Sequence, residues 1–277
     1  MKMLDQKVAH IGMIVCAVVI FAGAGVVYIC RAELSSFVWN KYHWGEVALA
    51  LGTTDAKVLR DIGEQHYGST FSREYRPVLA EKAYVKLIEV DPQQKGIYVQ
   101  LARIYFVQGK LVEALDMVEK EMENSPEDPL PFYMRGLIYG YRNQAGDLGR
   151  AEADFKKYTE ARPDEWAGYN DLAWVMLKQG KYKEVEVLLS EAIVMREEFG
   201  VNPWILNSLG VAMLNGGQYA KAAEIFDGAL TLSEQVTPEQ WHAAYSGNSP
   251  DSIPNDLAGF RASIKRNLER ARLLSAQ

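Results

Sequence analysis

Few side chains in this sequence have the types and spacings that chemistry needs. The two cysteines, Cys16 and Cys30, lie in one apolar stretch, so the rest of the chain offers no reactive thiol, disulfide framework or zinc pattern. The four histidines are scattered and form no His-x-x-x-His pair. The sequence also lacks a phosphate-binding Gly-x-x-x-x-Gly-Lys loop and a Gly-x-Ser-x-Gly nucleophile turn. The histidines are His10, His43, His66 and His242.

Carboxylates are numerous, but their spacing places them on the outer faces of helices, where they are solvated. We therefore expect a protein that is not an enzyme and that binds neither a metal nor a cofactor. The chain has 277 residues, of which 48% are hydrophobic, so it has ample material for a folded core. Thirty Lys and Arg against 36 Asp and Glu give a net charge of −6, which argues against a nucleic-acid partner.

One segment has the character of a membrane span. Residues 8–30 contain no Lys, Arg, Asp or Glu, and a helix needs about 20 apolar residues to cross a bilayer. Trp39, Tyr42 and Trp44 follow, and such rings favour the membrane interface. We predict an uncleaved anchor that contacts the lipid bilayer through residues 8–30. The alternative is a signal peptide cleaved after the small residues 22–24.

The orientation of this anchor is less determined by the sequence. Lys2 and Lys7 before the span are balanced by Arg31 and Lys41 after it. The short tail that precedes the span favours an N-terminus in the cytoplasm. We accordingly expect a single-pass protein of a bacterial inner membrane, with its large C-terminal part in the periplasm.

The rest of the chain repeats with a period of 34 or 37 residues. In each unit a small residue lies where a second helix would approach closely, and apolar residues follow at helical spacing. Gly109, Gly180 and Gly217 fall between the two helices of their units, where a left-handed turn is needed. Each unit is therefore predicted to be a helical hairpin. The two small-residue registers are Ala80, Ala114, Ala151, Val185 and Ala222, and Gly68, Ala102, Gly136, Ala173 and Gly210.

This pattern resembles the tetratricopeptide repeat (TPR) over residues 58–234. The second unit supplies most of the expected positions, namely Tyr98, Leu101, Ala102, Tyr105, Gly109, Ala114 and Pro126. Three residues depart from the pattern: Arg135 replaces a Leu, and Glu121 and Val185 replace Ala. The resemblance implies an all-α fold, a right-handed solenoid of about five TPR-like hairpins with C-terminal capping helices.

The predicted organisation has four parts. Residues 1–32 form the N-terminal tail and transmembrane helix, 33–57 a juxtamembrane helix or linker, 58–234 the five repeats and 235–277 the capping helices. In the last part, Thr237 and Gln240 can form a capping box, and a final amphipathic helix spans about residues 256–276. Its basic face is either solvated or a contact for an acidic partner or lipid headgroups; it comprises Arg261, Lys265, Arg266, Arg270 and Arg272.

The resemblance further implies a concave groove lined by the first helix of each unit. Aromatic rings and amides dominate the groove positions, and both suit a peptide or protein ligand. The alternative is that these rings pack against neighbouring repeats or under the C-terminal helices. The carboxylate clamp of some relatives is missing, because Gln65, Ser69 and Gln100 occupy its positions. The predicted binding residues are Arg103, Phe106, Tyr133, Tyr141, Asn170, Trp174, Lys178, Trp204 and Asn207.

An anchor joined to a binding module raises the local concentration of that module near membrane partners. The leading hypothesis is therefore a membrane-anchored scaffold that binds a protein or peptide and helps to assemble or stabilise a membrane or envelope complex. One alternative is a chaperone-like biogenesis or secretion factor that holds client chains. The other is a permanent structural subunit of a large membrane complex.

Overall fold

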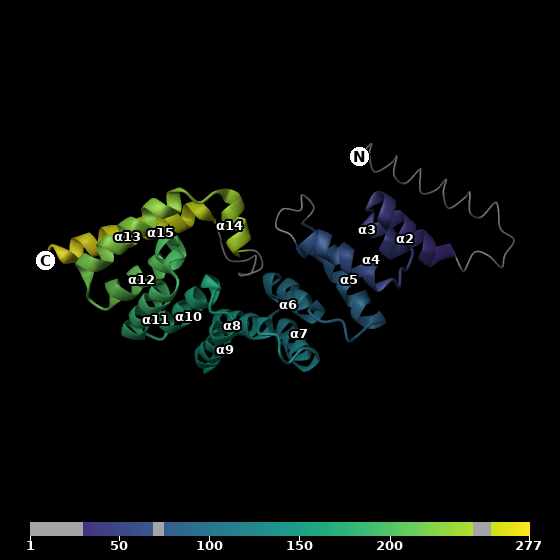
Figure 1. Ribbon diagram of the computed structural model, residues 1–277, viewed down its shortest axis with the longest axis horizontal. Coiled ribbons are helices and arrows are strands. Elements are labelled where there is room, and N and C mark those ends of the chain that lie inside the picture. The colour runs from purple at the N-terminus through teal and green to yellow at the C-terminus, as the bar shows by residue number, and fades with distance from the viewer. Residues whose placement is uncertain (1–29, 69–74, 246–255) are drawn as a thin grey trace. The chain divides into compact units, whose positions relative to one another are not determined.

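A computed structural model describes residues 30–68, 75–245 and 256–277 of the chain (Figure 1). These residues form 14 α-helices and no β-strand, so the all-helical prediction is confirmed for them. None of these helices is both long and apolar enough to cross a bilayer. The predicted anchor lies outside the described residues, apart from Cys30. The chain divides into two compact units, the first ending at Gln94 and the second beginning at Lys95.

The described part of the first unit contains four α-helices, of which the first and the last are the longest. Asp55 caps the helix of residues 56–63, because its carboxylate accepts the backbone N–H groups of Lys57 and Val58 at 2.9 and 3.2 Å. A π-helical turn, Glu64–Gly68, continues that helix. The helices are α2 (Cys30–Tyr42), α3 (Gly45–Ala50), α4 (Ala56–Gly63) and α5 (Pro77–Val90).

Trp39 differs from its expected role as an interface ring. It is 3% exposed and belongs to the core of the first unit, because α2 and α3 fold back onto α4 and α5. The sequence-based prediction grouped Trp39 with Tyr42 and Trp44 because all three are aromatic. Residues at different positions of a helix point to different sides of it, however, so one ring can be buried while another is exposed. Tyr42 stays 38% exposed. The buried partners of Trp39 are Ala48, Val58, Ile62, Leu79 and Ala83.

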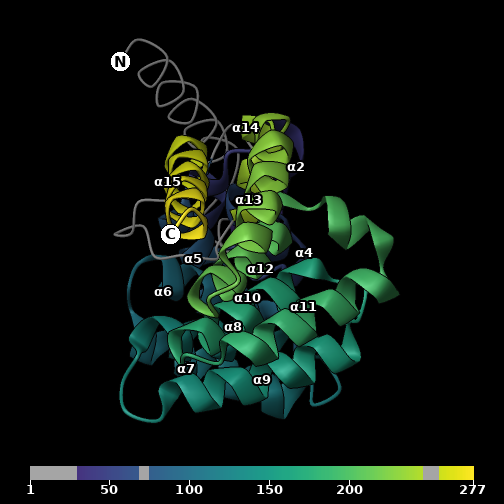
Figure 2. The same ribbon diagram turned by 90° about the vertical axis from the view of Figure 1, so that its left-hand side faces the viewer.

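The second unit contains four successive helix pairs and two C-terminal helices (Figure 1). Figure 2 shows α15 lying beside α13, with which it packs extensively. A 3-10 turn, Glu197–Val201, occupies the insertion before the fourth pair. The pairs are α6 (Ile97–Val107) with α7 (Leu111–Asn124), α8 (Leu130–Arg142) with α9 (Asp147–Ala161), α10 (Trp166–Lys178) with α11 (Tyr182–Met195), and α12 (Pro203–Asn215) with α13 (Tyr219–Glu234). The C-terminal helices are α14 (Pro238–Tyr245) and α15 (Leu257–Ser275).

Positions without a side chain bring the helices of a pair together. A Cβ atom added to Gly136 would lie 2.9 Å from the ring of Phe155, and one added to Gly210 would lie 2.7 Å from the ring of Phe226. The small-residue register is thus confirmed at these two pairs. In the first unit Gly63 also lies against the ring of a partner residue, Tyr84 of α5.

The turn glycines behave as expected. Gly109, Gly180 and Gly217 have φ angles of +74°, +75° and +81°, which is the left-handed region that favours glycine.

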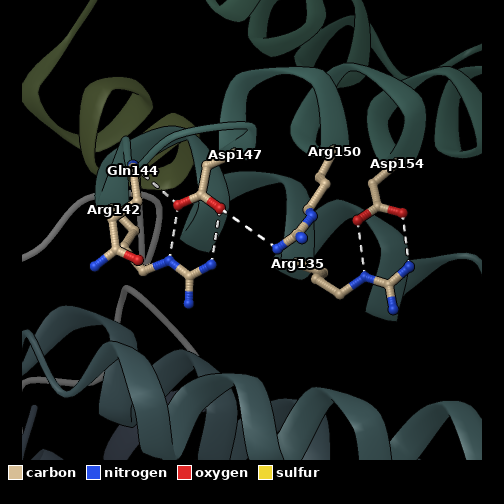
Figure 3. A network of polar contacts seen from close by, with 6 residues as sticks. All are labelled: Arg135, Arg142, Gln144, Asp147, Arg150 and Asp154. Atoms are coloured by element: carbon tan, nitrogen blue, oxygen red, sulfur yellow. Dashed lines mark hydrogen bonds and ion pairs between the residues drawn. The ribbon is translucent and has the colours of Figure 1, made fainter.

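Two departures from the repeat pattern have a polar role. Glu121 is fully buried, and its carboxylate accepts the backbone N–H groups of Gly96 at 2.8 Å and Tyr98 at 3.1 Å. It therefore caps the start of α6 from the neighbouring helix. Arg135 forms two hydrogen bonds of 2.8 Å with the carboxylate of Asp154, which is 5% exposed (Figure 3). A bidentate ion pair therefore replaces the apolar contact of the usual Leu.

The C-terminal helices begin as predicted. Thr237 and Gln240 exchange hydrogen bonds of 2.9 and 3.2 Å, which is a capping box. Arg261 on α15 donates to the carbonyl oxygens of Ser233 and Val236 and so satisfies the last turn of α13. Part of the predicted basic face is thereby used within the fold, whereas Lys265, Arg266 and Arg270 are exposed.

The cap supplied by Glu121 gives a stability prediction. Glu121→Ala leaves the buried N–H groups at the start of α6 without their acceptor, so we expect a loss of about 1–3 kcal/mol in the free energy of unfolding. Glu123→Ala, an exposed glutamate of the same helix, is the matched control and should change little. Urea unfolding of both variants measures the difference, and equal midpoints would contradict the capping role.

Candidate functional site

The second unit contains a pocket of about 250 Å³ between α8, α10 and α12. Ala244 of α14 and Phe260 of α15 also line it. Five of the nine predicted binding residues lie together here: Tyr141, Asn170, Trp174, Trp204 and Asn207. The first helices of successive pairs therefore present their predicted positions to one shared space.

One wall is a row of rings from three helix pairs. The ring centroids of Phe106 and Tyr141 are 5.3 Å apart, and those of Tyr141 and Trp174 are 4.9 Å apart. Phe106 is fully buried, so it supports Tyr141 from behind rather than lining the pocket. Gly140 makes room for this wall, because a Cβ there would lie 2.5 Å from the Trp174 ring. Such offset ring contacts hold large side chains in fixed positions.

A second wall centres on Trp204, which is 8% exposed. Its ring stacks on Trp166 at 5.0 Å and on Phe260 at 5.8 Å, and Trp241 of α14 lies 6.0 Å away. The C-terminal helices thus fold over this end of the predicted groove, which was one of the two alternatives left open by the sequence. The end formed by Tyr141 and Trp174 lines the pocket.

The polar side of the pocket is built around a carboxylate. Asp171 accepts hydrogen bonds from the Tyr133 hydroxyl at 2.7 Å and from the Asn170 amide at 3.3 Å. The Asn170 oxygen in turn accepts the Ser208 hydroxyl at 2.8 Å. Burial raises the pKa of Asp171 to about 6, although its two hydrogen bonds act to lower it. The side-chain oxygen of Asn207 is buried and accepts no hydrogen bond from a described residue.

The other predicted residues lie around the pocket without lining it. Tyr133 is buried behind Asp171, and burial together with that carboxylate raises its pKa well above the usual value. Lys178 is exposed; its ammonium lies 4.4 Å from the centre of the Trp174 ring and donates to the Gly140 carbonyl at 2.9 Å. Arg103 donates to the Gln100 side chain at 3.2 Å.

Sequence reasoning missed several lining residues, above all Asp171, Trp166, Ser208 and Phe260. Asp171 directly follows the predicted Asn170, but the repeat pattern assigns no groove position to it. Phe260 comes from a helix far along the chain, and no local pattern indicates where that helix packs. Among the described residues, no group of three His, Cys, Asp or Glu side chains is arranged to hold a metal ion.

Comparison with known proteins agrees with this architecture. Residues 143–184 match the family model of the tetratricopeptide repeat. This segment therefore resembles a TPR repeat, and the described helices form an all-α, TPR-like repeat fold. The chain is 31% identical over 148 residues to human Tetratricopeptide repeat protein 16, a match that covers 49% of this chain and only 16% of that relative. TPR proteins generally mediate protein–protein interactions and are typically non-enzymatic.

Two solved structures resemble this chain in fold. A tetratricopeptide repeat protein from Parabacteroides merdae has a TM-score of 0.55 at 17% identity, covering 90% of this chain and 100% of its own. A thermophilic TPR protein from Thermus thermophilus has a TM-score of 0.54 at 17% identity, covering 77% of this chain and 99% of its own. At these identities the likeness concerns the fold alone.

We expect a Trp→Ala substitution to lower the free energy of unfolding by different amounts in the two walls. Trp204→Ala removes a ring packed between three others, so we expect a loss of about 3–5 kcal/mol in the free energy of unfolding. Trp174→Ala, whose ring borders the pocket, should cost clearly less. Chemical denaturation of the two variants checks this order, and a larger loss for Trp174→Ala would show that the pocket wall is core.

Proposed function

We propose that this TPR chain is a membrane-anchored scaffold that binds a protein or peptide in the pocket of its second unit and helps to assemble a membrane or envelope complex. The observation that carries the proposal is the pocket itself. It combines rigid aromatic walls with a polar side whose Asn207 oxygen lacks a hydrogen-bond donor among the described residues. Rings supply contact area at low entropic cost, and free polar groups orient an extended backbone.

The membrane part of the proposal is supported by the sequence of residues 8–30, which has no charged residue. The described chain begins with a helix, α2, directly after that segment. On α2, Phe37 is 47% exposed, and the Lys41 ammonium lies 5.4 and 5.6 Å from the ring centres of Phe37 and Tyr42. Exposed rings beside a lysine suit a membrane interface.

The proposed arrangement keeps the predicted boundaries. Residues 1–32 anchor the chain, 33–57 connect it, 58–234 form five repeats and 235–277 cap them. The packing of α4 on α5 supports counting this pair as the first repeat. For localisation we retain a bacterial inner membrane with the repeats in the periplasm, which rests on the charges around the span.

The test is affinity capture of the full chain after gentle detergent extraction of its host membranes, with mass spectrometry of what copurifies. We expect one stoichiometric set of membrane proteins that is lost with Trp174→Ala. Val187→Ala, at a 44% exposed residue on α11 outside the pocket, is the matched control and should retain the set.

The other outcomes discriminate among the alternatives. Many unrelated chains in substoichiometric amounts would favour the chaperone-like factor. A stoichiometric set that survives both substitutions would favour a permanent structural subunit bound through other surfaces, and would contradict a role for the pocket. Recovery of the chain from broken cells without detergent would contradict the anchor.

A further inference from the structure

We propose that the pocket receives a cationic side chain, Arg or Lys, of the bound peptide, held against the Asp171 carboxylate between the aromatic walls. The inference rests on the proposed function, because it specifies which residue of a partner the same pocket recognises.

The argument begins with the hydrogen bonds of Asp171. Each carboxylate oxygen accepts one donor, and both donors, the Tyr133 hydroxyl and the Asn170 amide, are neutral. A carboxylate has about four acceptor sites, so roughly two remain. No Lys, Arg or His of the described ranges lies within ion-pair distance of it. A desolvated carboxylate without a counter-charge is costly, and this cost is relieved when a cation binds.

The buried carboxylates among the described residues of the second unit are already satisfied by charge or by a helix terminus. Asp147 is held by Arg142, Asp154 by Arg135, and Glu152 by Lys156 and Lys181 (Figure 3 shows the first two). Glu121 accepts the N–H groups at the start of α6. Asp171 differs from these four because it accepts hydrogen bonds only from neutral side chains. Of the five carboxylates, it is the one that lines the pocket.

The aromatic walls complement a cation. Tyr141, Trp174, Trp166 and Trp204 line the same space, and the faces of such rings attract ammonium and guanidinium groups. The chain already shows this attraction where the Lys178 ammonium lies 4.4 Å from the Trp174 ring centre. The Asn207 oxygen, which accepts no hydrogen bond from the described part of the chain, offers a further acceptor for a guanidinium N–H.

The size of the pocket fits one side chain. Its volume of about 250 Å³ is below the range of roughly 300–1,000 Å³ in which drug-sized ligands bind. A guanidinium or ammonium on an aliphatic stem can place its charge at Asp171 while the stem packs between the rings.

Cation binding at Asp171 has a pH dependence with a definite sign. The pKa of the free carboxyl is about 6, so lowering the pH from 7.5 to 5 protonates it and should weaken binding of an Arg peptide by about tenfold. The titratable groups around it are Tyr133 and Tyr141, whose pKa values burial raises, and Lys178, whose pKa burial lowers. Arg103 of α6 adds a positive charge that acts on Tyr133. The lining from α12, α14 and α15 does not titrate; it comprises Trp204, Asn207, Ser208, Ala244 and Phe260.

The test selects peptides from a random twelve-residue library on the full chain in detergent. The same selection is made on Asp171→Asn, which keeps the shape of the side chain, and on Asp164→Asn, an exposed aspartate that controls for the loss of one negative charge. We expect Arg or Lys to recur at one position of the peptides selected by the wild type and by Asp164→Asn. This recurrence should disappear with Asp171→Asn.

Defined peptides then make the test quantitative. Replacing the recurrent Arg by citrulline, a neutral analogue of the same shape, should weaken binding at least about tenfold to the wild type and have little effect with Asp171→Asn. The citrulline peptide should also lose the pH dependence between pH 7.5 and 5.

The contradicting outcomes separate the two proposals. Selected peptides without a recurrent cation, or cationic peptides that bind Asp171→Asn equally well, would overturn this inference and leave the peptide-binding role standing. Failure of all three proteins to enrich any peptide would overturn the proposed function and this inference with it.

Discussion

The helix pairs of this protein depend on close backbone approach at positions that carry no side chain. The rings of Phe155 and Phe226 lie where a Cβ on Gly136 or Gly210 would be, so each pair closes on a single packing geometry. Gly140 does the same between neighbouring pairs, since the Trp174 ring covers its backbone. Packing that builds the solenoid therefore also positions a wall of the pocket.

Charge is arranged around this packing in two ways. Where the repeat pattern loses an apolar residue, a buried polar contact takes its place, as with Glu121 at the start of α6 and Arg135 with Asp154. At Asp171 the half-buried carboxylate has no cation within ion-pair distance among the described residues, and its raised pKa reflects its desolvation. The paired and capping carboxylates stabilise the fold. The carboxylate of Asp171 can instead gain a favourable charge interaction when a cationic ligand binds.

Much of the architecture could be predicted from the sequence because repeat packing is local. Small residues and turn glycines recur at a fixed spacing, so the all-helical hairpins, the turns at Gly109, Gly180 and Gly217 and the helix of residues 257–275 follow from the pattern. The pocket was only partly predictable. Its predicted residues come from that pattern, but Ala244 and Phe260 reach it by non-local packing. The burial of Trp39 likewise depends on how α2 folds back.

The central claim is that a partner contacts the chain at this pocket, and site-specific photo-crosslinking in intact membranes tests it most directly. A benzophenone amino acid replaces Tyr141 in the pocket wall or, in a second protein, Val187 on α11. The account predicts that position 141 crosslinks to a partner protein and that position 187 does not. A partner captured from position 187, with only crosslinks inside the chain from position 141, would contradict it.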